Sequence, residues 1–237
     1  RFSRPGREPD RALIPDGGVI IRGGLVPVEK ALVSILEKNR VIPVAQFDDT
    51  QSALKTAELL QKHSINIIEI TFRTAGALES IKAVRKAFSG LTVGAGSLLT
   101  MEALRGALDA GVAFCVAPAL DLELVDFAVS RGCPFIPGVA TPTELNTALK
   151  KCAVIKLFPV SVLGGTEYIK AVAAPFRAVD FHLVPTGGVT QDNFLEYLKQ
   201  DRVISVGMSS IVDSALIKKG DYAALEERMK KVMTARP

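Results

Sequence analysis

From residue 41 onward the chain alternates between two patterns of hydrophobic and polar positions. Short runs of aliphatic residues, many of them β-branched, are each followed by a stretch in which apolar residues recur every three or four positions. The first pattern is typical of buried strands and the second of amphipathic helices. Eight such runs occur, at residues 41–47, 65–72, 91–98, 113–119, 134–140, 153–160, 181–188 and 203–209.

The intervening stretches carry helix start signals. Several begin with Thr or Asp, and the segment TPTE places Pro142 just inside a predicted helix with Glu144 in its first turn. Residues 190–200 predict another of these helices, and residues 221–235 predict a last one. The amphipathic stretch at 26–39 precedes the first strand and predicts an extra helix that covers one mouth of the sheet.

Strands that alternate with helices predict βαβ units and a parallel sheet. Eight units without a change of composition favour a closed (β/α)8 TIM barrel with an extra N-terminal helix. A doubly wound open sheet is the alternative, but it would place a glycine-rich loop after the first strand, and residues 45–51 contain no glycine. We therefore predict one barrel domain at 26–237 and an N-terminal extension or tail at 1–25.

Composition narrows the classes of partner. The net charge is +4, but Lys and Arg alternate with acidic residues and Trp is absent, so neither a basic nucleic-acid surface nor a base-stacking platform is indicated. No apolar run reaches the roughly 18–20 residues of a membrane helix. Cys115, Cys133 and Cys152 lie apart in the sequence without metal-ligand spacing. They are typical of buried thiols in a reducing compartment, and we expect a cytoplasmic protein.

The sixth run carries a lysine, Lys156, between aliphatic neighbours. Strand side chains alternate between two faces, and in a barrel the outer face lies under helices and must be apolar. Ile155 and Leu157 therefore point outward and Lys156 inward. The same alternation in the second run places Glu69, Thr71 and Arg73 on the inward face.

Two interpretations of these inward charges remain open. They can form a structural ion pair in which the charges compensate one another and have no catalytic role, although such buried pairs add little net stability. Alternatively, titratable groups that converge in one cavity form a reactive site. Lys156, desolvated and close to the cationic Arg73, would then be a neutral amine that attacks a carbonyl substrate and forms a Schiff base.

Glycines mark the ends of the last two runs. Gly187 and Gly188 end the seventh run, and Gly207 lies just before Ser209 in the eighth. A single glycine pair would fit ordinary turn chemistry. Two such loops after the seventh and eighth strands of a barrel favour a phosphate site, where exposed backbone N–H groups bind the anion.

Six motifs occur in the order and spacing of the KDPG/KHG aldolase family, which the chain resembles over about residues 28–235. These class I aldolases act on 2-keto-3-deoxy-6-phosphogluconate or 4-hydroxy-2-oxoglutarate. The motifs are EITFRT at 69–74, GAGSL at 94–98, IPGVATPTEL at 136–145, IKLFPV at 155–160, PTGGV at 185–189 and VGMSS at 206–210.

The resemblance implies a role for each matching residue. Lys156 would be the Schiff-base lysine, and Glu69 the general acid/base that moves protons through a water. Arg73 and Ser97, which stands where the family usually has Thr, would bind the substrate carboxylate. The other implied substrate-binding residues are Pro118, Thr186 near the substrate hydroxyls, and Gly187, Gly188, Gly207 and Ser209 around the phosphate. No metal and no cofactor is expected, the partner is a small 2-keto acid, and the assembly is expected to be a homotrimer.

Departures from the family pattern leave the substrate open. They are Met208, which is often Gly, Gln46, where some members carry a basic residue, and the segment APAL at 117–120. The resemblance implies cleavage of 2-keto-3-deoxy-6-phosphogluconate to pyruvate and glyceraldehyde 3-phosphate. The alternatives are a 4-hydroxy-2-oxoglutarate aldolase, a metal-dependent pyruvate aldolase and a non-catalytic sugar-phosphate-binding barrel.

We expect structural roles for four other polar residues. We expect His63 to be a solvated residue at a helix end, where it suits the helix dipole, and His182 to be structural. Asp48 and Asp49 precede a predicted helix and have no His or Cys near them in the sequence, which favours helix capping over metal binding.

Overall fold

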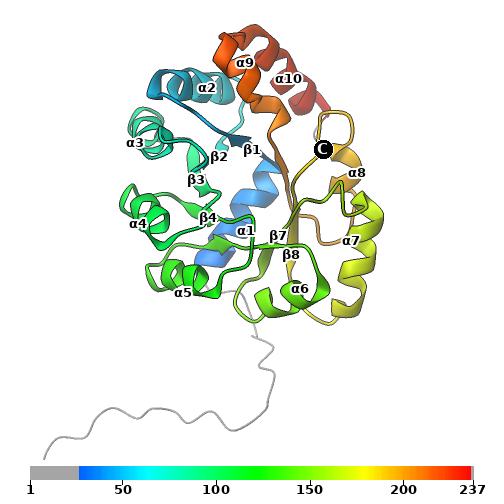
Figure 1. Cartoon of the computed structure of the whole chain (residues 1–237). Helices are drawn as coiled ribbons and strands as arrows, with labels where there is room; N and C mark the ends of the chain where they lie inside the picture. Colours follow the sequence, from blue (N-terminus) through cyan, green and yellow to red (C-terminus); the bar gives the residue numbers. More distant parts are fainter. Residues whose placement is uncertain (1–26, 236–237) are drawn as a thin grey trace, which may run out of the picture.

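The computed structural model describes residues 27–235 and has an α/β fold with parallel strands. Figure 1 shows the strands in the middle of the molecule and the helices that follow them in a ring outside. The predicted extension at 1–25 lies outside the described residues. None of the described helices is long and apolar enough to cross a membrane.

The strands form two parallel sheets, one in the order β5-β4-β3-β2-β1-β9 and one in the order β6-β7-β8. Two isolated parallel bridges, between Leu183 and Val203 and between Thr186 and Gly207, link β8 to the segment of β9. The strands are β1 (Val41–Ala45), β2 (Ile67–Thr71), β3 (Thr92–Gly96), β4 (Phe114–Val116), β5 (Phe135–Ile136), β6 (Gly138–Val139), β7 (Val154–Leu157), β8 (His182–Pro185) and β9 (Val206–Met208).

Each predicted strand run contains a strand, but the fifth run is divided. Pro137 separates β5 from β6, because proline has no N–H to donate to a neighbouring strand. Gly138 follows it at a close approach of two backbones, since a Cβ there would lie 2.3 Å from the carbonyl of Pro118. The break at Pro137 is therefore the point at which the chain passes from the first sheet, which contains β5, to the second sheet, which contains β6.

The helices begin largely where capping residues predict. Asp49, Thr100, Asp121 and Thr141 each accept a backbone N–H at a helix start, and Thr141 forms a capping box with Glu144. The helices are α1 (Pro27–Asn39), α2 (Thr50–Lys62), α3 (Ala77–Ala87), α4 (Met101–Asp109), α5 (Leu122–Ser130), α6 (Pro142–Ala148), α7 (Gly165–Ala173), α8 (Phe194–Leu198), α9 (Ser214–Lys219) and α10 (Tyr222–Ala235), with short 3-10 turns η1 (Ala174–Phe176) and η2 (Ser210–Val212).

One helix is shorter than predicted. The stretch at 190–200 contains only α8, because Asn193 accepts the backbone N–H of Thr190 through its side chain and closes a turn ahead of the helix. This local side-chain bond competes with helix formation in the first residues of the stretch.

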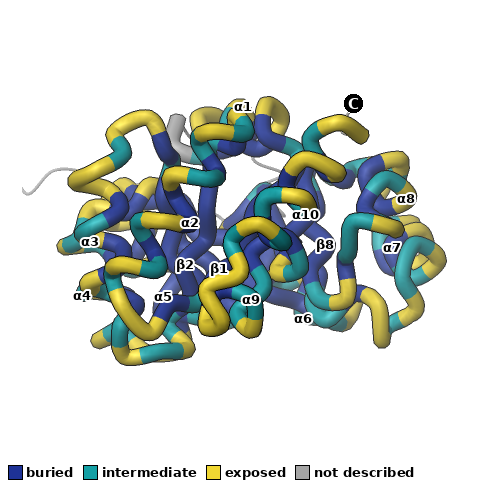
Figure 2. Tube along the Cα trace, turned by 90° about the horizontal axis from the view of Figure 1, so that it is seen from above, coloured by how far each residue is buried: buried dark blue, intermediate teal, exposed yellow. Residues whose placement is uncertain are grey.

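Two apolar clusters fill the molecule on either side of the strands. The larger one joins outward strand residues such as Ile68, Ile70, Ile155 and Leu157 to the surrounding helices. The smaller one joins α1 to the opposite strand face, and consists of Leu32, Val33, Leu36, Ile42, Ile67, Phe114, Val116, Ile136, Val154, Val184 and Ile204. Figure 2 shows α1 at one end of the buried strands. The predicted alternation of strand faces is confirmed, and Glu69 and Lys156 lie on the face opposite the outer cluster.

The cysteines are buried, as predicted, but two of them that lie apart in the sequence are neighbours in the structure. All three are free thiols, and the Sγ atoms of Cys115 and Cys133 lie 3.8 Å from each other. The hydrogen bond with Cys133, and secondly burial, raises the pKa of the Cys115 thiol. The pairing of β4 with β5 brings these distant sequence positions together.

The prediction for His63 is wrong in one respect. His63 does end α2, but its Nε2 lies 3.0 Å from Oε1 of Glu226 on α10, and it is therefore bonded rather than solvated. Asp49 caps α2 as predicted, whereas Asp48 pairs with Lys218 at 3.0 Å. Among residues 27–235 no group of His, Cys, Asp and Glu could hold a metal ion.

Candidate active site

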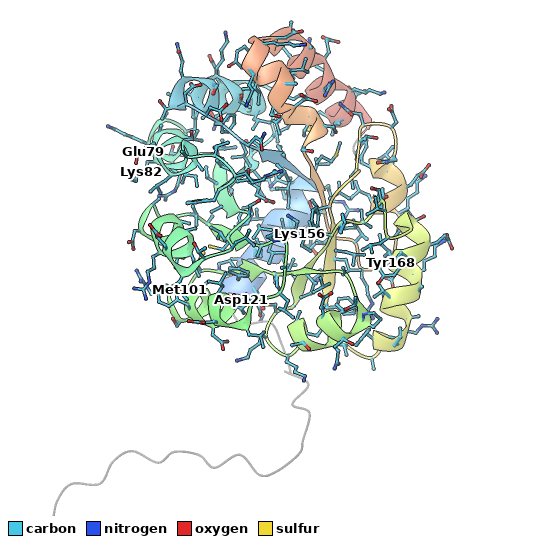
Figure 3. All side chains as sticks on the ribbon, viewed as in Figure 1. Glu79, Lys82, Met101, Asp121, Lys156 and Tyr168 are labelled. Atoms are coloured by element: carbon cyan, nitrogen blue, oxygen red, sulfur yellow. The ribbon has the colours of Figure 1, made fainter. Side chains whose placement is uncertain are left out.

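Lys156 lies near the middle of β7 and is only 5% exposed. Its Nζ is 3.7 Å from Oε1 of Glu69 and 5.4 Å from the centre of the Phe158 ring. In Figure 3 Lys156 lies at the centre of the molecule, whereas other labelled side chains such as Glu79 and Lys82 lie at the periphery. A buried amine beside an aromatic face and a single carboxylate is a candidate nucleophile.

Glu69 comes from β2 and is 2% exposed. Its Oε1 has no hydrogen-bond partner among the described residues, and 3.7 Å to Lys156 is an ion-pair distance rather than a hydrogen bond. The carboxylate rests on Gly96 of β3, where a Cβ would lie 2.0 Å from the same Oε1. Glycine at this position therefore leaves the room against the neighbouring strand that the carboxylate occupies.

Arg73 lies two residues beyond the end of β2. Its Nε donates to Oγ1 of Thr71 at 3.2 Å, and that hydroxyl donates to the carbonyl of Ala45 on β1 at 3.0 Å. Thr71 is fully buried and Arg73 is exposed. The Nε of the guanidinium is thus held by a hydrogen bond, while the side chain is exposed to solvent. This arrangement suits the binding of an anionic group.

Ser97 and Pro118 follow the ends of β3 and β4 and are half-buried. Ser97 has a left-handed backbone with φ of 57°, a conformation that costs free energy in residues other than glycine. The next residue, Leu98, donates its N–H to the carbonyl of Val116, so this turn is tied to β4.

The predicted phosphate loops lie side by side. The bridge between Thr186 and Gly207 joins them, and a Cβ at Gly207 would lie 2.4 Å from Oγ1 of Thr186. Gly187 and Gly188 have φ of 92° and 80°, which glycine adopts without strain. The N–H groups of Gly188 and Ser209 donate no hydrogen bond within the described part of the chain. Such a cluster of amides is able to bind an anion.

Three neighbours of the site were not identified from the sequence. Thr71 holds Arg73, Gly96 supports the Glu69 carboxylate, and Ser161 after β7 lies where its Oγ would be 2.0 Å from a Cβ at Gly188. The inward alternation of β2 included Thr71, so a signal for it was present. Gly96 and Ser161 act through contacts between strands that no local pattern contains.

A buried lysine beside a glutamate, on parallel strands that are followed by a pair of glycine-containing loops, is the arrangement expected of a Schiff-base lyase. The comparisons with known proteins agree. The KDPG and KHG aldolase family matches residues 32–228. The chain belongs to this family.

Two relatives illustrate the similarity. The 2-dehydro-3-deoxy-phosphogluconate aldolase of Treponema pallidum is 39% identical over 189 residues, which cover 79% of this chain and 89% of the relative. The KHG/KDPG aldolase of Escherichia coli K12 is 33% identical over 193 residues, which cover 80% and 88%.

Solved structures give the same result. The KDPG aldolase of Legionella pneumophila, with pyruvate captured as a covalent carbinolamine intermediate, has a TM-score of 0.79 and 30% identity, covering 84% of this chain and 97% of that one. The 2-keto-3-deoxy-6-phosphogluconate aldolase of Zymomonas mobilis with 3-phosphoglycerate also has a TM-score of 0.79, with 32% identity and coverage of 86% and 96%.

Proposed function

We propose that the protein is a class I aldolase that cleaves 2-keto-3-deoxy-6-phosphogluconate to pyruvate and glyceraldehyde 3-phosphate. The observation that carries the proposal is the buried pair of Lys156 Nζ and Glu69 Oε1 at 3.7 Å. The amine supplies the nucleophile and the carboxylate supplies the acid/base at one place, which is what an imine-forming lyase requires.

The reaction follows from these two groups. The Lys156 amine attacks the 2-keto carbon, water leaves, and a protonated Schiff base forms. Glu69 takes the proton from the hydroxyl on carbon four, and the bond between carbons three and four breaks with its electrons moving into the imine. The aldehyde departs, the resulting enamine takes a proton on carbon three, and water releases pyruvate and the free amine. We propose that no metal or organic cofactor takes part, because the iminium itself accepts the electrons.

The remaining residues bind the two ends of the substrate. Arg73 and Ser97 hold the carboxylate, with Pro118 lining that end, and Thr186 meets the hydroxyls. The amides of Gly187, Gly188 and Ser209 receive the phosphate, with Gly207 leaving room beside Thr186. The N–H groups of Gly188 and Ser209, which donate no hydrogen bond in the described part of the chain, support a phosphorylated substrate over 4-hydroxy-2-oxoglutarate. Comparing kcat/KM for the two substrates tests this choice, and equal values would remove the preference.

We also propose that residues 26–237 form one domain in which the two sheets close into a (β/α)8 barrel, with α1 at its N-terminal mouth. The continuity of β5 with β6 through Pro137 and the bridges from β8 to the segment of β9 support closure on both sides. A homotrimer remains a prediction from the family resemblance, and a cytoplasmic location remains a prediction from the cysteines. Sedimentation of the purified protein tests the trimer, and a monomer at all concentrations would contradict it.

Borohydride reduction in the presence of pyruvate tests the chemistry. The reductant converts the imine to a stable amine, and peptide mass mapping identifies the modified lysine. We expect one adduct, on Lys156. Chelator treatment should leave the reaction unchanged, whereas loss of activity with chelator and no adduct would favour the metal-dependent alternative.

A further inference from the structure

Three side-chain hydroxyls of the segment 71–80 bond to the end of β1 and the residues that follow it. Thr71 donates to the carbonyl of Ala45 at 3.0 Å, Thr74 to Phe47 at 2.5 Å and Ser80 to Asp49 at 3.4 Å. The acceptors are alternate carbonyls of one short stretch, 45–49. A Cβ at Gly76 would lie 2.4 Å from the Asp48 carbonyl, so the two backbones also touch. The loop that carries Arg73 is therefore fixed to the end of β1.

Thr71 differs from the other two hydroxyls because it also accepts a hydrogen bond. Its single proton is donated to Ala45, so its lone pairs are left for Nε of Arg73 at 3.2 Å. This is the only hydrogen bond or ion pair of the Arg73 side chain within residues 27–235. With Nε engaged, both terminal nitrogens of the guanidinium remain available to bind a carboxylate in bidentate geometry.

We infer that Thr71 is a positioning residue for Arg73, and this inference rests on the proposed function of Arg73 as the binder of the pyruvyl carboxylate. An exposed arginine samples many rotamers, and ordering it on binding costs conformational entropy. The buried Thr71 hydroxyl, itself held by β1, limits that sampling before the substrate arrives. In the described part of the chain the Thr71 hydroxyl bonds to Ala45 and Arg73 and makes no hydrogen bond to Lys156, so its effect passes through Arg73.

The test measures reductive trapping of pyruvate on Lys156 as a function of pyruvate concentration. Thr71→Val keeps the shape and removes the hydroxyl. We expect its half-saturating pyruvate concentration to rise about tenfold, the effect of losing one hydrogen bond to a charged group, while the yield at saturation stays at the wild-type level. Thr71→Ser, which keeps the hydroxyl, should remain within about twofold of the wild type. Thr71→Ala carries the same expectation as Thr71→Val if the valine variant does not fold.

A matched control is available on α2. Thr56 is also fully buried, but its Oγ1 has no hydrogen-bond partner in the part of the chain that the structure describes. Thr56→Val should leave the half-saturating concentration unchanged. In an Arg73→Gln background, Thr71→Val should add no further change, because the group through which it acts is gone.

The outcomes separate the two claims. A wild-type protein that forms no adduct on Lys156 overturns the proposed function and the role of Thr71 with it. Normal wild-type trapping together with an unshifted Thr71→Val, or an equal shift in the Arg73→Gln background, overturns the role of Thr71 alone. A drop in the saturating yield of Thr71→Val that Thr71→Ser shares would likewise contradict positioning through Arg73.

Discussion

Replacing Gly96 by alanine should remove most of the activity. A Cβ at this position would lie 2.0 Å from Oε1 of Glu69 and 2.6 Å from its carboxyl carbon, and contacts under 3.0 Å are essentially never seen. The carboxylate must therefore move by about 1 Å or more, and such a displacement of a reacting group costs about 10²-fold in rate. Overpacking between two buried strands should also lower the free energy of unfolding by about 1–3 kcal/mol.

Gly106→Ala is the matched control for this substitution. Gly106 lies inside α4, and a Cβ there would meet only the Leu78 side chain, at 3.7 Å. Alanine should stabilise this helix by about 0.5–1 kcal/mol and leave turnover unchanged. Urea unfolding and steady-state turnover of both variants provide the assay. Wild-type turnover in Gly96→Ala would refute the assignment of Glu69 as the acid/base.

Three further predictions concern the acid/base, the phosphate loops and pH. Glu69→Gln should still form the pyruvate adduct but lose about 10²–10⁴-fold in turnover, and near-normal turnover would assign the base elsewhere. Ser209→Asp should raise KM for the phosphorylated substrate only, since the new carboxylate repels the phosphate, and inorganic phosphate should compete with that substrate in the wild type; equal losses on both substrates would remove the phosphate assignment. Hydrogen bonds from Lys62, and secondly His63, lower the pKa of Glu226 to about 2, from 4.5. Because the folded pKa is the lower one, this contribution to stability is complete above pH 4.5 and is lost as pH falls toward 2. Acid titration of unfolding should show that loss in the wild type and not in Glu226→Gln, and identical acid profiles would contradict it.

Local patterns predicted the positions that depend on strand alternation. Ile155 and Leu157 belong to the outer cluster, so the inward direction of Lys156 follows from the sequence alone. The helix caps were also predictable from nearby residues, since Asp49 and Thr141 cap the starts of α2 and α6 as expected. Both features can be predicted from residues that are close to each other in the sequence.

The features that the sequence did not predict depend on contacts between distant segments. The bond of His63 to Glu226 joins α2 to α10, and the contact of Cys115 with Cys133 arises from strand pairing. The support of Glu69 by Gly96 likewise requires the register of β2 and β3, in which Thr71 pairs with Gly96 and Glu69 with Gly94. Register follows from packing over the whole sheet, so a single segment does not contain it.

The central claim is that Lys156 is the amine that forms the Schiff base. It lies on an inward strand face, 5% exposed, beside Glu69. Lys156→Arg should lose both trapping and turnover, because a guanidinium stays charged and forms no imine. The most direct measurement is peptide mapping after borohydride reduction with pyruvate. We predict a single adduct on Lys156 that is absent from Lys156→Arg. An adduct on another lysine, or full turnover in Lys156→Arg, would contradict the mechanism.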